Sequence, residues 1–295
     1  SGISNFETFF QFSNFTVDIM SELNQCDQSI TARKEMKGYI SQKKDMYEIL
    51  MKFLDNSDNN ENYLQDLINI IHQQMQEEKR DELEEFLQLL TNIANNFHRD
   101  DSLFKKLFQI IEHYEDQIKQ TLSNIEIFHI FESNKKILLF LFQKEIITVD
   151  DNIYIELLSK TEENGNRYCH FFYPEIKKLV GEDKVKDIEK ELFEKYPDVL
   201  DFFDEKRQEG ENDSFICSLI REDSVEKFVE YVNRLSISLN SEVKPSLFET
   251  NSFLIENENT TLIEYAVFFG SFQIFQYLKF NNVDLKQSLW LYAIH

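Results

Sequence analysis

Residues 259–285, NTTLIEYAVFFGSFQIFQYLKFNNVDL, decide which fold the chain is expected to adopt. Two apolar segments of helical periodicity flank Gly270, whose freedom at positive φ suits a left-handed turn between two helices. Thr261 can cap the first helix, and Glu264 three residues later completes a capping box. Ala266 is small, as close packing against a neighbouring unit requires. The stretch therefore predicts a helix hairpin, and the inner face of its second helix comprises Ile274, Phe275, Tyr277 and Leu278.

Similar units recur in the C-terminal part of the chain. They are SFICSLIREDSVEKFVEYV (214–232), TLIEYAVFFGSFQIFQYL (261–278) and the shorter SLWLYAIH (288–295). Hairpins that each bury a face on the next are typical of a solenoid. Because the third unit is incomplete, we expect further repeats to follow His295 in the natural protein.

The middle unit resembles the ankyrin repeat, whose pattern T-P-L-H-x-A-A-x-x-G-H precedes an apolar second helix. The matching residues are Thr261, Ala266, Gly270 and the pair Tyr277-Leu278. In this unit Leu262, Glu264 and Val267 replace the Pro, the His and the second Ala of the pattern. In the first unit Ser214, Leu219 and Asp223 replace the Thr, the first Ala and the Gly. A long insertion, roughly residues 236–260, separates these two units. A degenerate first repeat with such a loop resembles a capping unit.

Several stretches of the sequence are similar to sequences of an expanded family of ankyrin-repeat proteins in parasitic protists. These stretches are GENDSFICSLIREDSVEKFVEYVN, KPSLFETNSFLI, TLIEYAVFFGSFQIFQYL and SLWLYAIH. The stretches MKGYISQKKDMYE, SNKKILLFLF and YCHFFYPEI resemble the N-terminal region of that family, a domain of unknown function. The resemblance covers nearly the whole chain and is least distinctive over residues 55–120. It implies a helical N-terminal domain followed by ankyrin repeats, with no assigned biochemical activity.

The N-terminal part of the chain predicts a series of amphipathic helices, the first of them over residues 3–24. Within this series, residues 121–160 are a candidate for a cryptic repeat. The segment 135–158 aligns with 271–294 at an offset of 136 (135 to 271), whereas the boxes Ser123…Glu126 and Thr261…Glu264 match at 138 (123 to 261). The alignment therefore needs a two-residue slip. A shared repeat origin and a chance agreement of two amphipathic helix pairs both explain the match.

The composition favours an all-α protein and restricts its partners. The chain has 28 Phe and 12 Tyr to build a core, but 3 Pro and 6 Gly are too few turn residues for a many-stranded β fold. A net charge of −23 repels phosphate groups, so we expect no binding to nucleic acid and no docking on an anionic membrane. An acidic surface serves solubility, or it meets a basic partner.

The cysteines and the hydropathy indicate a soluble cytoplasmic protein. Cys26, Cys169 and Cys217 are widely spaced and form no C-x-x-C pair, which favours reduced, buried thiols over disulfides or a zinc module. No apolar run approaches about 18 residues, so we expect no membrane span.

No group of residues in the sequence supports an enzyme, a cofactor or a metal site. Cys169-His170 is an adjacent thiol–imidazole pair, but it is flanked by Tyr168, Phe171, Phe172 and Tyr173, which favours core packing over nucleophilic catalysis. Four other histidines lack metal-ligand spacing and lie on separate predicted helices: His72, His98, His113 and His129. Phosphate-binding glycine motifs are absent from the sequence.

Four residues are candidate contacts for a partner protein. Phe268 and Phe269 precede Gly270 at positions that often border the binding surface of ankyrin repeats, and Arg221 and Glu222 are the equivalent pair in the preceding unit. The alternative is that both Phe side chains pack under the insertion 236–260 or under the next repeat.

These observations predict an all-α protein with an N-terminal helical domain over 3–207 and a degenerate ankyrin-like solenoid over 208–295. The expected function is non-catalytic binding of an unidentified protein through the repeat surface. The alternatives are an acidic decoy that occupies a basic surface of its partner, and an enzymatic activity in the N-terminal domain. In a chain that ends at His295, an apolar patch of Leu289, Trp290 and Tyr292 is also expected to favour a homodimer.

Overall fold

The structure, a computed structural model, describes residues 30–55, 61–74, 80–96, 101–160, 168–182, 185–196, 202–257 and 259–294. Over these ranges the protein is all-helical, and its β structure is limited to one isolated bridge between Glu242 and Thr261. The predicted all-α class is thereby confirmed. The helix expected over 3–24, Cys26 and His98 lie outside the described residues.

The chain divides into two compact units inside helix α6 (Glu115–Thr121), between Asp116 and Gln117. The boundary that the sequence places at 207/208 falls inside helix α13 (Phe203–Glu209) and within the second unit. A separately folding domain over 208–295 therefore stays a prediction.

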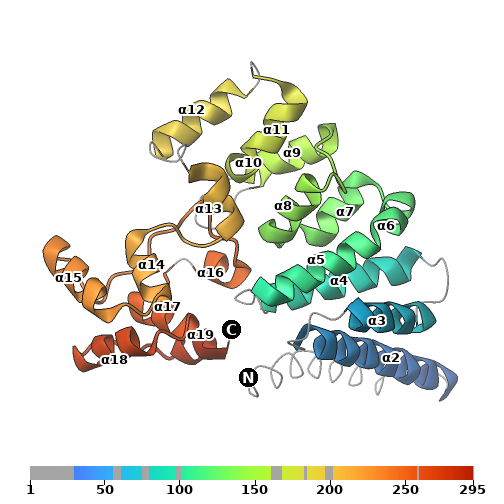
Figure 1. The fold of residues 1–295 in the computed structure, drawn as a ribbon, viewed down its shortest axis with the longest axis horizontal. Helices are drawn as coiled ribbons and strands as arrows, with labels where there is room; N and C mark the ends of the chain where they lie inside the picture. Colours follow the sequence, from blue (N-terminus) through green and yellow to red (C-terminus); the bar gives the residue numbers. More distant parts are fainter. Residues whose placement is uncertain are drawn as a thin grey trace. The chain divides into compact units, whose positions relative to one another are not determined.

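In the first unit the described residues before α6 form the helices α2 (Ile30–Asp55), α3 (Glu61–Gln74), α4 (Arg80–Asn96) and α5 (Asp101–His113) (Figure 1). Helix α2 packs against α3 and α5, and α4 packs against α5. The apolar stripe of α4 is buried at Leu83, Phe86, Leu87, Leu90 and Ile93. Lys106 of α5 donates hydrogen bonds to the carbonyl oxygens of Phe53 and Leu54 at 3.0 and 2.8 Å, which satisfies two acceptors at the end of α2.

The second unit contains shorter helices. Those before the predicted repeats are α7 (Asn124–Phe131), α8 (Lys135–Gln143), α9 (Asp151–Ser159), α10 (Tyr168–Phe171), α11 (Tyr173–Val180), α12 (Lys186–Lys195) and α13. Those within them are α14 (Phe215–Arg221), α15 (Val225–Leu235), α16 (Ser252–Glu256), α17 (Leu262–Phe268), α18 (Phe272–Phe280) and α19 (Leu289–Ile294).

Three helix pairs of this unit, α7–α8, α14–α15 and α17–α18, end in the same way. The second helix of each pair is followed by a residue at positive φ (Glu145, Ser236 and Asn282). The amide of the next residue donates a hydrogen bond to the carbonyl oxygen five residues earlier in the chain. The bonds are Ile146 to Leu141, Ile237 to Val232, and Val283 to Leu278, at 2.9, 2.9 and 3.3 Å. This six-to-one bond is the Schellman motif, which satisfies a carbonyl group that the last helical turn leaves unpaired.

The first helices of the first and third pairs also match. Capping boxes join Ser123 to Glu126 in α7 and Thr261 to Glu264 in α17, as predicted. The N-cap positions of the second helices are Asn134 and Ser271, which are 137 positions apart (134 to 271), so the offset of 136 used in the sequence alignment is wrong by one residue. With an offset of 137 positions, Ile137 and Leu141 align with Ile274 and Leu278, and all four side chains are fully buried.

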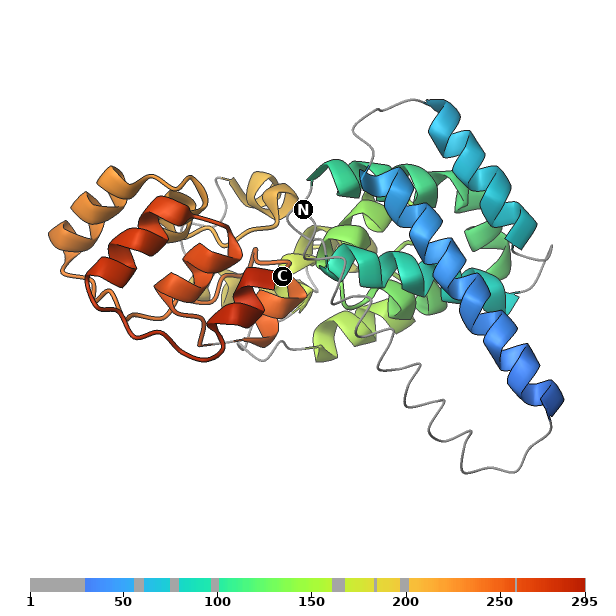
Figure 2. The same cartoon turned by 90° about the horizontal axis from the view of Figure 1, so that it is seen from below.

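The hairpins α14–α15 and α17–α18 lie side by side, with α14 against α17 and α15 against α18 (Figures 1 and 2). Ala266 is completely buried in the core between them, as its small size predicted. On α18 the predicted inner face is fully buried at Ile274 and Leu278 but only half-buried at Phe275 and Tyr277. The turns between the helices use positive φ at Gly270, as predicted, and also at Asp223.

The insertion 236–260 contains a stretch that lies in the protein interior. Residues 246–251, called here the buried segment, are all buried. Ser246 donates to Asp213 at 2.7 Å, and Thr250 donates to the carbonyl oxygen of Gly210 from its hydroxyl at 2.7 Å and from its amide at 3.1 Å. The insertion thus fills space beside α13 and α14. Among the helices that the structure describes, none combines the length and the apolar character that crossing a bilayer demands.

Candidate partner-binding site

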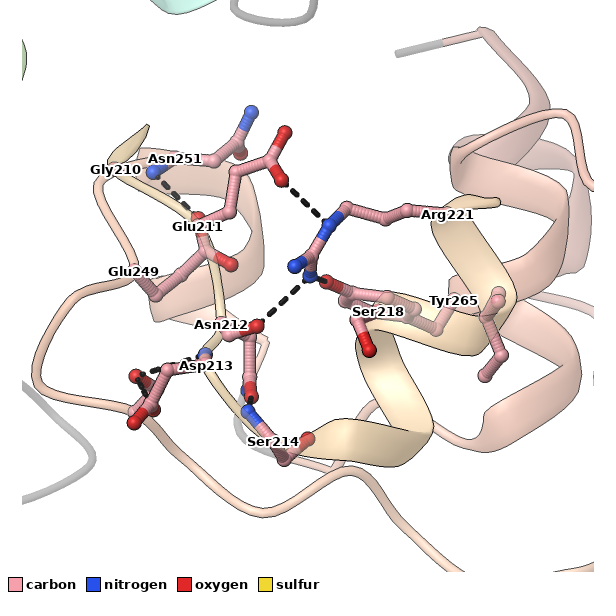
Figure 3. A network of polar contacts seen from close by, with 12 residues as sticks. Gly210, Glu211, Asn212, Asp213, Ser214, Ser218, Arg221, Glu249, Asn251 and Tyr265 are labelled. Carbon is pink, nitrogen blue, oxygen red and sulfur yellow. Dashed lines mark hydrogen bonds and ion pairs between the residues drawn. The ribbon is translucent and has the colours of Figure 1, made fainter. Parts of the chain in front are cut away.

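Arg221, a predicted contact residue at the end of α14, lies in a polar network (Figure 3). Its Nε is 2.5 Å from Oε2 of Glu211, and its Nη1 donates to the carbonyl oxygen of Asn212 at 2.8 Å and to the hydroxyl of Tyr265 at 3.0 Å. The guanidinium group also lies 5.9 Å from the ring centre of Phe269. Arg221 therefore connects the 211–212 segment to α17 and directs its charge into the protein.

Phe268 lies in the interior, with 1% of its surface exposed. Its ring stacks on Phe253 of α16 at a centroid distance of 5.9 Å and an interplanar angle of 6°. This is the alternative in which the residue packs under the insertion. In this conformation a partner cannot reach Phe268, because α16 covers it.

Phe269 and Glu222 are more accessible. The ring of Phe269 is half-buried and lies 4.6 Å from the ring of Tyr265 and 5.0 Å from that of Phe268. Glu222 is exposed at the end of α14. The structure thus leaves part of Phe269 and the Glu222 carboxylate on the surface.

Asp223, which replaces the glycine of the repeat pattern, connects the two hairpins. Its carboxylate accepts hydrogen bonds from the amides of Gln273 and Ile274 at 3.0 and 2.9 Å. These amides belong to the first turn of α18, where the helix dipole also favours a negative charge. Ser271, the residue at the N-cap position, instead donates its hydroxyl to the carbonyl oxygen of Ile220 at 2.5 Å. Sequence reasoning missed this role because the acceptor and the helix are 50 residues apart.

Glu264, which replaces the histidine of the repeat pattern, connects α17 to the following segment. Its carboxylate accepts from the amide and hydroxyl of Thr261 at 2.9 and 2.7 Å and from the hydroxyl of Ser288 at 2.7 Å. Burial opposes ionisation, but these hydrogen bonds and Lys286 at 3.9 Å outweigh it, so the pKa of Glu264 is lowered. The capping box is thus also a contact with the next unit.

Large apolar side chains are exposed mainly in the region from α13 to α19. Seven of the nine that the described residues expose lie there, and the other two are Ile155 and Leu179. Phe272 and Phe280 of α18 are 63% and 81% exposed, and Trp290 of α19 is 57% exposed. Phe272 and Phe280 are about 12 Å apart along the helix axis, because each residue rises 1.5 Å. They form the most accessible aromatic surface in this region.

The predicted dimer patch is divided by the structure. Trp290 is exposed, but Leu289 packs partly against the hairpin core and Tyr292 is buried. The hydroxyl of Tyr292 lies 3.0 Å from that of Thr260, and its ring meets Phe253 edge-on at 5.0 Å. Within this predicted patch, Trp290 alone presents a mainly exposed side chain.

Cys169 and His170 lie in the one-turn helix α10 and are both buried among aromatic side chains, as predicted. The Nε2 atom of His170 is 3.3 Å from Oε2 of Glu191, and the rings of Phe171 and Phe172 are 4.9 Å apart. Cys169 and Cys217 are free thiols. Burial raises the pKa of Cys217 to about 11, which leaves that thiol protonated and poorly nucleophilic at neutral pH.

The structure brings together two histidines that the sequence places on separate helices. The rings of His72 and His113 are 6.2 Å apart in the first unit, and Tyr114 meets both edge-on. Burial and the neighbouring His72 lower the pKa of His113. Across the ranges that the structure describes, no three His, Cys, Asp or Glu side chains are arranged to hold a metal ion.

Comparison of the chain with protein-family models, with curated proteins and with solved structures finds no match. The resemblance to ankyrin-repeat proteins therefore stays a prediction, and any functional assignment depends on the geometry of the chain itself.

Proposed function

We propose that this protein is a non-catalytic protein-binding module, and that α18 and α19 of its hairpin stack present the partner surface. The observation that carries the proposal is the exposure of Phe272, Phe280 and Trp290 on these two helices. Exposed aromatic residues are typical of interface cores, because they bury large apolar areas at a small entropic cost.

The hairpins provide a rigid support for this surface. Asp223 and Ser271 connect α14–α15 to the start of α18, and Glu264 connects α17 to Ser288 ahead of α19. Two like hairpins that stack helix on helix, each with a left-handed turn and a Schellman end, support an ankyrin-type solenoid. In such a solenoid the fixed side chains buried between the units carry the fold, and the exposed side chains select the partner.

The predicted contacts are revised accordingly. Phe269 and Glu222 stay candidates at the edge of the surface, Arg221 acts mainly as an internal connection, and Phe268 is covered by α16. The two free, buried thiols support a reducing, cytoplasmic location.

A small cavity lies beside the buried segment. Its volume is about 30 Å³, which is an order of magnitude below the roughly 300 Å³ at which pockets begin to hold metabolites. It holds about one water molecule.

The test compares affinity capture by the wild-type chain with capture by the double variant Phe272→Asp/Phe280→Asp, at low salt and at 0.5 M salt. Asn233→Asp, which adds a charge at an exposed position of α15, is the control for non-specific charge effects. We expect a protein that is retained at high salt by the wild type and the control but lost by the double variant.

A partner that is indifferent to both Phe residues and is released by salt would contradict this proposal. That result would favour the acidic-decoy alternative, since contacts between exposed charges are screened at high ionic strength.

A further inference from the structure

Glu249 is a buried carboxyl group with one satisfied and one unsatisfied oxygen. It belongs to the buried segment and is 6% exposed. Its Oε1 accepts hydrogen bonds from the amides of Thr250 and Asn251 at 3.0 and 2.9 Å. Its Oε2 is buried, and no hydrogen-bond partner for it exists among the residues that the structure describes.

The side chain of Glu249 lies beside the chain at Glu211 and Asn212 and beside a small cavity. Figure 3 shows its side chain reaching toward the chain at Glu211 and Asn212. The residue lines the cavity of about 30 Å³, together with Asn212, Ser246 and Tyr265. An ionised carboxylate here would have two amide donors and a space for about one water molecule in place of full hydration.

The charged groups that face Glu249 are Lys135 of α8, Glu211, and Arg221 of α14. Lys135 donates to the carbonyl oxygen of Leu247 at 3.4 Å and lies 4.9 Å from the ring centre of Phe171. Arg221 directs its hydrogen bonds to Glu211, Asn212 and Tyr265. The two cations attract a negative charge on Glu249 and Glu211 repels it.

Two neutral groups also face Glu249, namely Tyr265 of α17 and Cys217 of α14. Burial raises the pKa of both, so neither ionises near neutral pH. Their protonation therefore does not change over the range in which a carboxyl group of raised pKa titrates.

Burial raises the pKa of Glu249 to about 7, although the Asn251 amide and Lys135 act in the opposite direction. The folded group is therefore half neutral near physiological pH. When the surrounding segment opens and the group is solvated, its pKa returns to the ordinary value of 4.5. Opening is thus linked to loss of a proton.

The buried segment fixes helix α16, which covers Phe268 of α17. Thr250 fixes it to Gly210, and Asn251 caps α16 by accepting from the amide of Leu254 at 3.1 Å. Phe253 of α16 then stacks on Phe268 and meets Tyr292 edge-on. Displacement of residues 249–251 would therefore remove the cap of α16 and uncover Phe268.

We propose that Glu249 is a proton-operated latch, which holds residues 246–257 over α17 when its carboxyl group is neutral and releases them when it ionises. Release uncovers Phe268, an aromatic surface that is hidden in the closed form. This inference does not rest on the proposed function, because it concerns an equilibrium within the chain.

The sign and the size of the effect follow from the two pKa values. The raised folded pKa stabilises the closed form fully below about pH 4.5, and this stabilisation is lost as the pH rises to about 7. Because each pKa unit corresponds to a factor of ten, the ratio of open to closed form increases on the order of 100-fold across this range.

The test is hydrogen–deuterium exchange of the full chain between pH 5 and pH 8, corrected for the intrinsic pH dependence of exchange. We expect protection of the amides in residues 246–257 to fall by tens-fold with rising pH in the wild type and to stay constant in Glu249→Gln, which is neutral at every pH. Amides of α15 serve as the internal control.

Constant protection of residues 246–257 in the wild type would overturn the proposal, as would the same pH dependence in Glu249→Gln. If that variant does not fold, a ¹³C titration of the glutamate carboxyl groups in the wild type decides the question. A spectrum in which every glutamate titrates below about pH 5.5 would also overturn the latch.

Discussion

The contact between Gly210 and the buried segment can be measured with two glycine substitutions. Gly210 and Gly270 both have positive φ, at 69° and 67°. A Cβ atom at Gly270 would meet no atom within 4 Å, whereas one at Gly210 would lie 2.7 Å from Oγ1 of Thr250. Alanine at either position therefore incurs the same backbone strain, but only Gly210→Ala also collides with a neighbour.

The expected difference can be worked from the contacts. Left-handed backbone costs an alanine about 1–2 kcal/mol at both sites. At Gly210 the carbonyl oxygen also accepts two hydrogen bonds from Thr250, each worth about 1 kcal/mol. Because Thr250 is short, branched and buried, it can avoid the new Cβ only by giving up these bonds. Gly210→Ala should therefore lower the free energy of unfolding by about 1–3 kcal/mol more than Gly270→Ala.

The assay is urea denaturation of the full chain, followed by tryptophan fluorescence. Trp290 is the one tryptophan of the sequence and lies in the second unit, so its signal reports on the unit that carries both glycines. Equal destabilisation by the two substitutions, within about 0.5 kcal/mol, would refute the reasoning that Thr250 holds the insertion against Gly210.

Three further predictions concern the connections made by Asp223 and Glu264 and the exposed side chain of Trp290. Asp223→Ala removes the acceptor at the start of α18 and also places an alanine at positive φ, so it should cost about 2–4 kcal/mol of unfolding free energy in the same assay. Glu222→Ala, at an exposed neighbour, should be nearly neutral, and equal effects of the two substitutions would contradict the capping role. Glu264→Gln should destabilise by about 1–3 kcal/mol at pH 7. Because the folded pKa of Glu264 lies below the ordinary 4.5, the difference from the wild type should shrink as the pH falls below that value, and a pH-independent difference would exclude the ionised form as its source. If the chain dimerises, Trp290→Gln should shift it toward monomer in light scattering, and a dimer unaffected by this change would exclude Trp290 from the contact.

Local chemistry made part of the fold predictable. Thr261 and Glu264 form a capping box because both groups lie within one turn of each other, and Gly270 takes positive φ because it has no Cβ atom. The burial of Ile274 and Leu278 followed from helical periodicity. Each of these features depends on residues within about ten positions.

The offset between the hairpins α7–α8 and α17–α18 shows where a match of apolar patterns fails. Apolar residues on a helix recur at three and four positions, so an alignment shifted by one residue still pairs apolar with apolar. The N-cap positions Asn134 and Ser271 have no such ambiguity, because each marks the start of a helix. Apolar periodicity thus indicates a helix pair without determining its register.

The sequence by itself determined the all-helical class, the hairpin at 261–278, the capping box that begins its first helix and the glycine turn that ends it, because these features depend on groups within one or two turns. Only the tertiary structure decided that Phe268 is covered by α16, that Asp223 caps a helix 50 residues away, and that Glu249 is buried beside Tyr265. These outcomes depend on which surfaces meet in space. The buried segment 246–251 contains Ser, Glu, Thr and Asn, and such polar residues enter an interior only where distant groups such as the Gly210 carbonyl supply their hydrogen bonds.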